Sequence, residues 1–345
     1  MKAVPALILM LIGACSGTLT AVGDGSFVQD SLAEVSGERM METVQSLESF
    51  GSRAFYLNSS LEAAQYIMDR FSSLKLWVTV QYFDVDGYSV PNVIGTKNGS
   101  DGAGGMYLFG AHYDSFNKEA TDKTVGASLM APGADDDASG VAAVLELATV
   151  TSDMVFERTI RFVAFGAEES GLNGSRAFAS AERSAGAAYV DTVIFDMIGY
   201  RDGDQNTVML FTDHPDEGIP GRIRQVVTDY HIDLSIQVVA RADYAFSDQY
   251  SFWQNGYPTT AILEEFVGRE PVNPYYHTEY DVSEHLCPEQ MEAVTRAVLG
   301  ALLELEQPEP ENGSSTALVA TVVIAATASS ATIAFVILRR RGRIG

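Results

Sequence analysis

The chain has 345 residues, with 46 acidic and 22 basic side chains and a formal charge of −24 at pH 7. This length suffices for one large α/β domain or two small ones. Hydrophobic residues make up 46% of the sequence and charged residues 20%, which excludes a disordered acidic chain. The acid excess argues against a surface for nucleic acid or anionic membranes, because phosphate binding needs clustered lysine and arginine. Cys15 and Cys287 are too few for a disulfide scaffold.

The N-terminal segment resembles a secretory signal peptide. Met1 and Lys2 precede an apolar run over 3–14, and small residues continue to Gly17. This run is shorter than the roughly 20 apolar residues that a membrane-spanning helix needs. We therefore expect residues 1–17 to be a signal peptide. The segment IGAC also resembles a lipoprotein processing site, so attachment of a lipid to Cys15 stays open as an alternative.

The C-terminal segment is typical of a membrane anchor. An uncharged run over 317–338 is followed by four arginines, at 339, 340, 341 and 343. At about 1.5 Å per residue the run reaches roughly 33 Å, enough to cross the hydrocarbon core of a bilayer. A buried terminal helix is the other interpretation, and cleavage of the tail would release the protein.

Basic residues favour the cytoplasmic side of a membrane. We therefore expect a transmembrane helix over 317–338, a basic cytoplasmic tail over 339–345 and a catalytic domain outside the cell. The segment QPEPENGSST over 307–316 would form the stalk between the domain and the anchor.

Residues 24–306 alternate between two hydrophobic patterns, with no long linker between them. Apolar residues at helical spacing predict helices, and short apolar runs predict strands. The predicted helices cover 40–50, 60–74, 138–152, 221–230 and 288–304, and the predicted strands cover 78–83, 90–95, 106–111, 159–166, 192–198, 208–212 and 259–263. This alternation predicts a single α/β domain, with a twisted, mostly parallel mixed sheet covered by helices on both faces. Ligands of such folds gather beyond the carboxyl ends of the strands.

Polar side chains follow two of these predicted strands. His112 and Asp114 come directly after the strand over 106–111. A solvated loop is one interpretation of this pair; the other is a metal-binding imidazole beside a carboxylate that fixes its tautomer. Three successive aspartates at 135–137 precede a predicted helix. Helix capping needs only one acid, and adjacent acids repel one another. The three aspartates therefore favour a bound cation, with only one of them positioned to bridge it.

Further along the chain, Glu168 and Glu169 follow the strand over 159–166. One such carboxylate can bind a metal while the other accepts a proton from water. Asp196 lies within the apolar run over 192–198, where an isolated carboxylate is costly without a partner or a metal. His277, in the aromatic segment NPYYHTEYD, would be structural if considered alone, and it becomes a candidate ligand only beside the other residues.

Together these segments supply two imidazoles and several carboxylates at strand ends, without cysteine. Nitrogen and oxygen ligands suit zinc, manganese or cobalt, and zinc is the commonest choice for hydrolysis. Two histidines and three carboxylates exceed the three protein ligands of a single catalytic zinc. A pair of metals that share one carboxylate would use them all.

Five motifs resemble the co-catalytic zinc aminopeptidase family. They are GAHYDS, APGADDDASG, AEESGLNGS, FDM and YYHT, in this order, and the resemblance covers residues 36–305. The family also contains aminopeptidase Y, glutamate carboxypeptidase II, glutaminyl cyclase and the transferrin receptor, and small secreted leucyl aminopeptidases of bacteria are nearest in layout. The resemblance implies that His112 and Asp196 hold one zinc. It implies that Glu169 and His277 hold the other, with Asp136 bridging the two.

The same resemblance implies catalytic roles. Glu168 would be the general base and later the proton donor, and Asp114 would orient His112. Tyr244 matches a tyrosine that helps to stabilise the tetrahedral intermediate, and Asp281 resembles the acid that follows the last ligand.

One motif departs from the family pattern. Ser247 and Asp248 match a Ser-Asp-His motif, but Gln249 replaces the histidine. This departure concerns the geometry of the substrate pocket rather than the metal ligands.

The resemblance implies an extracytoplasmic metallo-exopeptidase with two zinc ions per chain, for which Co²⁺ or Mn²⁺ are possible substitutes. The expected activity is removal of N-terminal residues from peptides by water activated at the metals. Two alternatives stay open: a carboxypeptidase or other amidase of the same family, and a metal-free, receptor-like binding protein. Peptides are the expected partners, together with a membrane through the C-terminal helix. No nucleic acid is expected, and the oligomeric state is left open.

Overall fold

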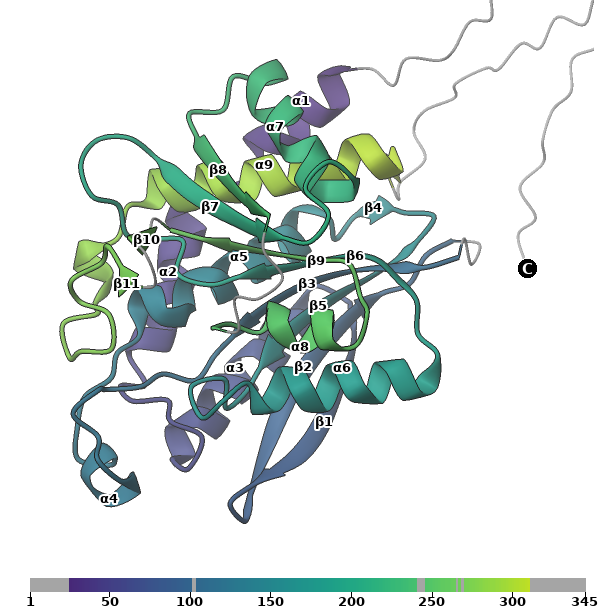
Figure 1. Ribbon diagram of the computed structural model, residues 1–345. Helices are drawn as coiled ribbons and strands as arrows, with labels where there is room; N and C mark the ends of the chain where they lie inside the picture. The colour runs from purple at the N-terminus through teal and green to yellow at the C-terminus, as the bar shows by residue number, and fades with distance from the viewer. Residues whose placement is uncertain (1–24, 101–103, 241–245, 265, 268–269, 311–345) are drawn as a thin grey trace, which may run out of the picture.

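An eight-stranded mixed sheet runs through the centre of the protein, as the computed structural model shows (Figure 1). The structure describes residues 25–100, 104–240, 246–264, 266–267 and 270–310. The strands are β1 (Trp77–Val85), β2 (Tyr88–Lys97), β3 (Met106–His112), β5 (Thr159–Phe165), β6 (Tyr189–Phe195), β7 (Thr207–Thr212), β8 (Ser235–Ala240) and β9 (Thr259–Leu263). Their order across the sheet is β1-β2-β5-β3-β6-β9-β7-β8. The central strands β5, β3, β6 and β9 are mutually parallel, and β7 runs antiparallel to β9.

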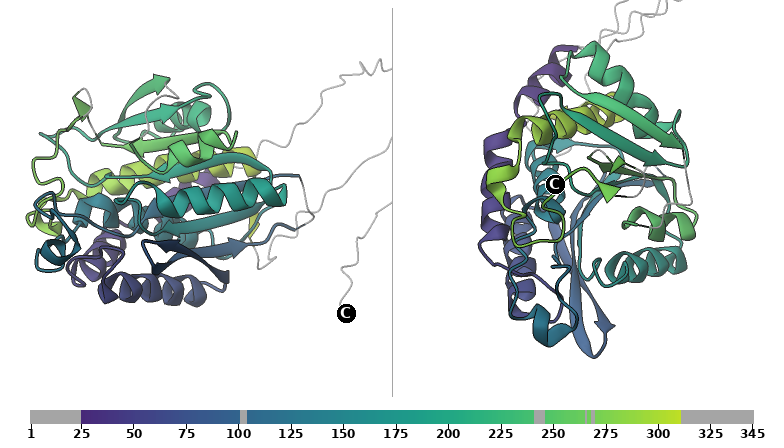
Figure 2. Two further views of the ribbon diagram at one scale, coloured as in Figure 1. Left: turned by 60° about the horizontal axis from the view of Figure 1, so that its bottom comes forward. Right: turned by 60° about the vertical axis from the view of Figure 1, so that its left-hand side comes forward.

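Helices cover both faces of this sheet (Figure 2). One face packs against α1 (Gly25–Ala33), α2 (Gly37–Glu48), α3 (Asn58–Ser73), α5 (Gly140–Val150), α7 (Gly218–Asp229) and α9 (Pro288–Glu306). The other face packs against α6 (Asn173–Ala185) and α8 (Gln249–Gln254). Short elements lie in the connections: α4 (Lys123–Gly126), η1 (Ala134–Ser139), η2 (Ser283–His285), β4 (Met154–Val155), β10 (Phe266–Val267), β11 (Glu270–Pro271) and β12 (Glu309–Pro310).

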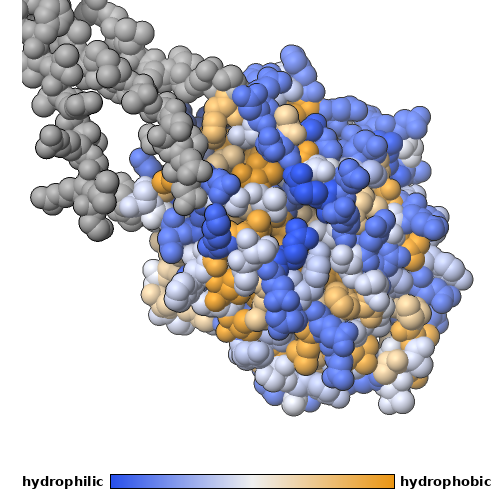
Figure 3. Space-filling model, turned by 180° about the vertical axis from the view of Figure 1, so that it is seen from behind, coloured by the Kyte–Doolittle hydropathy of each residue, from blue (hydrophilic) through white to orange (hydrophobic). Residues whose placement is uncertain are grey.

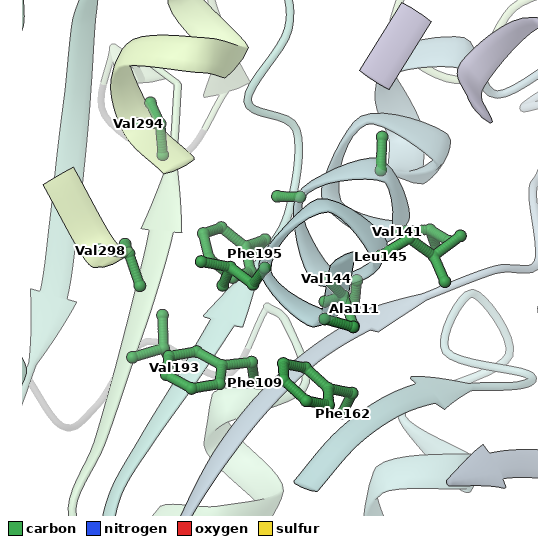
Figure 4. Close-up of a cluster of buried hydrophobic side chains, with 14 of the residues drawn as sticks. Phe109, Ala111, Val141, Val144, Leu145, Phe162, Val193, Phe195, Val294 and Val298 are labelled. Carbon is green, nitrogen blue, oxygen red and sulfur yellow. The ribbon is translucent and has the colours of Figure 1, made fainter. Parts of the chain in front are cut away.

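The alternation of side chains along each strand builds two cores. In β5, Phe162 joins the larger cluster on the α5 side, and its neighbour Val163 joins the cluster under α6 and α8. Helix α5 is buried almost throughout, and its sequence GVAAVLELATV is largely apolar apart from Glu146, which pairs with Arg39. Figure 4 shows its residues Val141, Val144 and Leu145 with Phe109 and Phe162 of the sheet. The surface seen in Figure 3 is largely hydrophilic, with apolar side chains scattered over it.

The predicted mixed α/β sheet with helices is confirmed. The structure adds α1, α6, α8 and β8, which the hydrophobic pattern did not predict. The buried face of α6 consists of Phe178 and small residues such as Gly174, Ser175 and Ala179, so this helix contains few large apolar side chains. Strand β6 ends at Phe195, so Asp196 lies just beyond the strand and not within it as predicted.

The predicted membrane segments fall outside the part of the chain that the structure describes. Among the described residues, no helix has the length and apolarity needed to cross a bilayer. The predicted signal peptide over 1–17 and the predicted helix over 317–338 lie outside those residues. The chain remains paired with the domain as far as Pro310, because β12 forms an antiparallel pair with β4.

A charged cluster ties β6, β7 and α7 together at the sheet edge where β6 begins. The imidazole of His214 lies between two carboxylates, with Nδ1 2.7 Å from Asp213 Oδ1 and Nε2 3.3 Å from Asp191 Oδ1. The other oxygen of Asp191 accepts the N–H of Ile219 in the first turn of α7 at 2.6 Å. Burial alone would lower the pKa of His214, but the two carboxylates outweigh it and raise the pKa to about 9.

This raised pKa predicts a pH-dependent contribution of His214 to stability. The protonated imidazole stabilises the fold below its unfolded pKa of about 6.5, and the contribution is lost as the pH rises through about 9. Burial also raises the pKa of Asp191, which opposes its ionisation, so we expect a net contribution of about 2 kcal/mol at low pH. The free energy of unfolding of His214→Gln, measured with urea, should therefore fall below wild type at pH 6 and converge with it above pH 9.

The matched control is His231→Asn, at an exposed turn position with a φ of 53° that asparagine tolerates. It should show the same difference from wild type at both pH values. A His214→Gln deficit that does not change with pH would contradict the charged role of His214.

Candidate metal centre

Three parallel strands deliver polar side chains to one edge of the sheet. His112 is the last residue of β3, Glu168 follows the end of β5 by three residues, and Asp196 directly follows β6. The strands are in register, with His112 of β3 opposite Phe165 of β5. Carboxyl ends of parallel strands lie at the same edge, so these residues come together although they are far apart in the sequence.

The chain turns sharply just after two of these strands. Ala167, beside Glu168, has a φ of 56°, and Met197, beside Asp196, has a φ of 54°. Residues other than glycine rarely adopt this left-handed conformation, and it clusters at functional sites. Here it turns the backbone so that the neighbouring carboxylates remain at the sheet edge.

The carboxylate of Asp136 lies between the two predicted imidazole ligands. Its Oδ1 is 3.2 Å from Nε2 of His112, and its Oδ2 is 3.1 Å from Nε2 of His277. The carboxylate of Glu169 approaches the same nitrogen of His277 at 3.0 Å, and that of Asp196 lies 3.8 Å from Nε2 of His112. The structure thus brings together the five residues that the resemblance assigned as metal ligands.

The three successive aspartates are used in different ways. Asp135 accepts the N–H groups of Gly199 at 2.7 Å and Tyr200 at 3.3 Å through one oxygen. Asp137 accepts three backbone N–H groups, from His112, Gly140 and Met197, at 2.9–3.2 Å. By distance alone Asp137 can also be grouped with His112 and Asp196 around a cation. We assign the ligand role to Asp136 instead, because both oxygens of Asp137 already bind amides.

Asp114 holds the two glutamates in place. Its Oδ1 accepts the N–H of Glu168 at 2.9 Å, and its Oδ2 accepts that of Glu169 at 3.3 Å. The resemblance also implies that Asp114 orients His112. Nδ1 of His112 lies 3.2 Å from the backbone oxygen of Asp114 and 3.7 Å from the carboxylate. The peptide oxygen of Asp114 is therefore the nearer partner of the imidazole, and the carboxylate positions the glutamate turn.

His277 reaches the site from the loop that precedes η2. Its ring stacks on Tyr276 and packs edge-on against Phe116. Asp281, four residues later, accepts the N–H of Asp135 at 2.9 Å and that of Asp136 at 3.1 Å. This carboxylate ties the loop of His277 directly to the loop of Asp136, which fixes the two ligands relative to each other.

The proximity of these groups shifts their pKa values strongly. Burial raises the pKa of Glu168 well above its usual range, against the opposing charge of His112. Burial and the charge of Asp136 raise the pKa of Glu169 to about 7. Burial alone would lower the pKa of His277, but Glu169 and Asp136 raise it to about 10. These shifts reflect strong interactions between the imidazoles and the carboxylates, a set of nitrogen and oxygen donors that can bind cations.

Two buried oxygen atoms at this edge suit a metal. Asp136 Oδ2 and Glu169 Oε1 are buried and make no hydrogen bond with any described residue. Buried carboxylate oxygens are normally paired, so atoms of this kind favour a cation. The described residues contain two groups of three possible ligand atoms, and within each group the atoms lie within 4.8 Å of one another. One group includes His112 and the other includes His277. The nitrogen and oxygen donors fit zinc, manganese or cobalt.

Asp248 is a further buried carboxylate near this edge. The structure buries it fully together with Ser247, and its two oxygens make no hydrogen bond with the described residues. Burial raises the pKa of Asp248 to about 7, and its charge contributes to the raised pKa of Glu168. Asp248 belongs to the Ser247-Asp248 motif of the sequence, but no sequence pattern indicates that it lies near Glu168. Tyr244 lies outside the described residues.

Imidazoles and carboxylates at the carboxyl ends of parallel strands, beside a further glutamate, are typical of metal-dependent hydrolases. The model for peptidase family M28 matches residues 92–302, well over half of the chain. The chain therefore belongs to peptidase family M28, which confirms the family expected from the five motifs and makes the protein a hydrolase.

Individual relatives agree with this assignment. A probable leucine aminopeptidase of Trichophyton verrucosum is 29% identical over 296 residues, which cover 82% of this chain and 77% of the relative. The LapA aminopeptidase of Legionella pneumophila has a similar fold, with a TM-score of 0.70 at 24% identity, covering 85% of this chain and 78% of LapA. A zinc aminopeptidase of Bacillus subtilis has a TM-score of 0.67 at 17% identity, covering 79% of this chain and 96% of that protein.

Proposed function

We propose that this protein is a zinc-dependent aminopeptidase with two zinc ions per chain. The observation that carries the proposal is the position of Asp136, whose two oxygens face His112 at 3.2 Å and His277 at 3.1 Å. A carboxylate in this position can bridge two cations. His112 and Asp196 would hold one zinc, and Glu169 and His277 the other. Bound zinc would supply Lewis acidity and lower the pKa of water towards about 7.

The protein's own residues account for the proton transfers. Hydrolysis of an amide adds hydroxide to the carbonyl carbon and a proton to the departing nitrogen. Glu168 is buried beside the ligands and has a raised pKa, so its carboxylate can take the proton from water and return it to the amine. The amides of Glu168 and Glu169 bind the same carboxylate of Asp114, which fixes the base relative to its neighbouring ligand.

The choice of an aminopeptidase rests on the names of relatives, which are leucine aminopeptidases. The alternatives are a carboxypeptidase or other amidase of the same family, and a metal-free binding protein.

An assay of substrate polarity decides between these functions. The zinc-loaded full chain should hydrolyse aminoacyl-nitroanilides and release the first residue of peptides, but leave peptides with a blocked N-terminus intact. The matched control is Glu168→Gln, which should retain zinc by elemental analysis and lose at least about 100-fold in kcat, since it removes only the proton acceptor. Cleavage of N-blocked peptides from the carboxyl end would support the carboxypeptidase. A folded protein that takes up no zinc and has no activity would support the binding protein.

The bridging role of Asp136 has its own test. Asp136→Asn should weaken the binding of both metals together, because one carboxylate serves both sites and the amide nitrogen is a poor ligand. Zinc content after dialysis against graded chelator concentrations, with wild type as reference, measures this loss. Loss of one zinc per chain with retention of the second at wild-type affinity would contradict the bridge.

We also propose that the protein is exported and anchored in a membrane by residues 317–338, with the catalytic domain outside and the C-terminus in the cytoplasm. The support is the uncharged run and the arginines that follow it. The full chain should stay in the membrane fraction after carbonate washing, whereas a chain that ends at residue 316 should not. Recovery of the full chain in the soluble fraction would contradict the anchor, and labelling of an attached lipid at Cys15 would favour the alternative.

A further inference from the structure

The side chain of Arg53 is fully buried beside the metal centre, in the segment between α2 and α3. Among the described residues, the hydrogen-bond partners of its guanidinium are all backbone carbonyl oxygens. Nε donates to Tyr113 at 2.7 Å, and Nη2 donates to Gly133 at 2.8 Å. Nη1 donates to Pro132 and, at 3.3 Å, to Leu47 near the end of α2. One side chain thus connects a helix end with two loops.

These two loops carry metal ligands. Tyr113 lies between His112 and Asp114, and the carbonyl groups of residues 132 and 133 lie immediately before the turn that presents Asp136. The contact is close: Gly133 has a φ of +55°, and a Cβ atom there would lie 2.8 Å from Nη2 of Arg53. The guanidinium therefore sets the separation of the two loops, and with it the separation of the two ligands.

The backbone N–H of Arg53 also helps to link these two loops. Its N–H donates to Ser115 Oγ at 2.9 Å, and that hydroxyl donates to the carbonyl of Ala131 at 2.7 Å. Ser115 is also buried. A second bridge, which involves no charge, thus runs from the segment of Arg53 to the same pair of loops.

A buried guanidinium is expensive, so its presence needs a reason. Among the described residues, no carboxylate lies within 4.0 Å of its nitrogen atoms. Burial lowers the pKa of Arg53, but the charges of Asp281, Asp114, Asp136 and Asp137 oppose this effect. Arginine remains charged in proteins, so it places a permanent positive charge behind these carboxylates.

We infer that Arg53 is a positioning residue of the metal centre, which holds the His112 loop and the Asp136 loop at the separation that metal binding requires. This inference rests on the proposed function, because it concerns the same metals. Arginine is suited to the role because its planar fork can bind several carbonyl groups at fixed angles, whereas lysine has one flexible donor group. The field of its charge also reduces the repulsion between the carboxylates that face the metals.

The test measures metal binding directly. Metal-free full chain is titrated with Co²⁺, followed by calorimetry and by the visible absorption of bound cobalt. Arg53→Lys keeps the charge but loses the fork, so we expect a 10–100-fold weaker Co²⁺ affinity and an altered absorption spectrum, with unchanged far-UV circular dichroism. The matched control is Arg158→Lys, which changes a half-buried arginine paired with Glu306 at the start of β5, the opposite edge of the sheet. It should bind Co²⁺ as wild type does.

A second variant covers the case in which Arg53→Lys does not fold. Ser115→Ala removes only the uncharged bridge, and we expect it to fold and to bind Co²⁺ two- to tenfold more weakly. Folded Arg53→Lys with an affinity within twofold of wild type would overturn the inference. Unfolded Arg53→Lys combined with wild-type binding by Ser115→Ala would also overturn it, because Arg53 would then serve folding alone. Wild type that binds no Co²⁺ would overturn the proposed function itself.

Discussion

The burial of many carboxylates at one edge of the sheet is the constraint on which the rest of the structure depends. Asp114, Asp135, Asp136, Asp137 and Glu168 are all buried there, together with Asp196 and Asp281. Each ionised carboxylate must find hydrogen bonds or a cation, because an unpaired buried charge costs several kcal/mol or more. The loops around the site take shapes that bring backbone N–H groups to these carboxylates. Those N–H groups are the main hydrogen-bond donors to the buried acids.

The partners of these acids divide them into two groups. Asp114, Asp135, Asp137 and Asp281 each accept two or more backbone N–H groups, so their charge is balanced by the loops that they shape. Asp136 donates its own backbone N–H to Asp281, and its carboxylate oxygen Oδ2 makes no hydrogen bond with any described residue. Within the described residues, acids with amide partners build the scaffold, and acids without them face the imidazoles.

The sequence predicts the central strands and the types of ligand, but it does not predict which acids bind backbone amides and which face the imidazoles. Apolar runs predict the central strands because burial on both faces removes every polar residue from them. No pattern distinguishes Asp135 from Asp136 or Asp137, because the difference lies in which distant amides each one meets. No sequence pattern indicates the role of Arg53 for the same reason. Its partners are backbone carbonyl groups, which every residue carries. The turn that moves Asp196 out of β6 depends on the left-handed backbone of Met197, which the apolar sequence does not reveal.

Folding and metal binding in this protein are therefore coupled through electrostatics. The amides and Arg53 hold like-charged groups close together before any cation arrives, so the folded state carries repulsion that the unfolded chain relieves by separating the charges. A cation that binds only the folded arrangement removes this repulsion and stabilises the fold by an amount that grows with the logarithm of its concentration above Kd. The same preorganisation lowers the cost of binding, because the ligands need little reordering when the metal enters. The closely spaced carboxylates that repel one another in the fold are thus the same groups that favour the binding of small, highly charged cations.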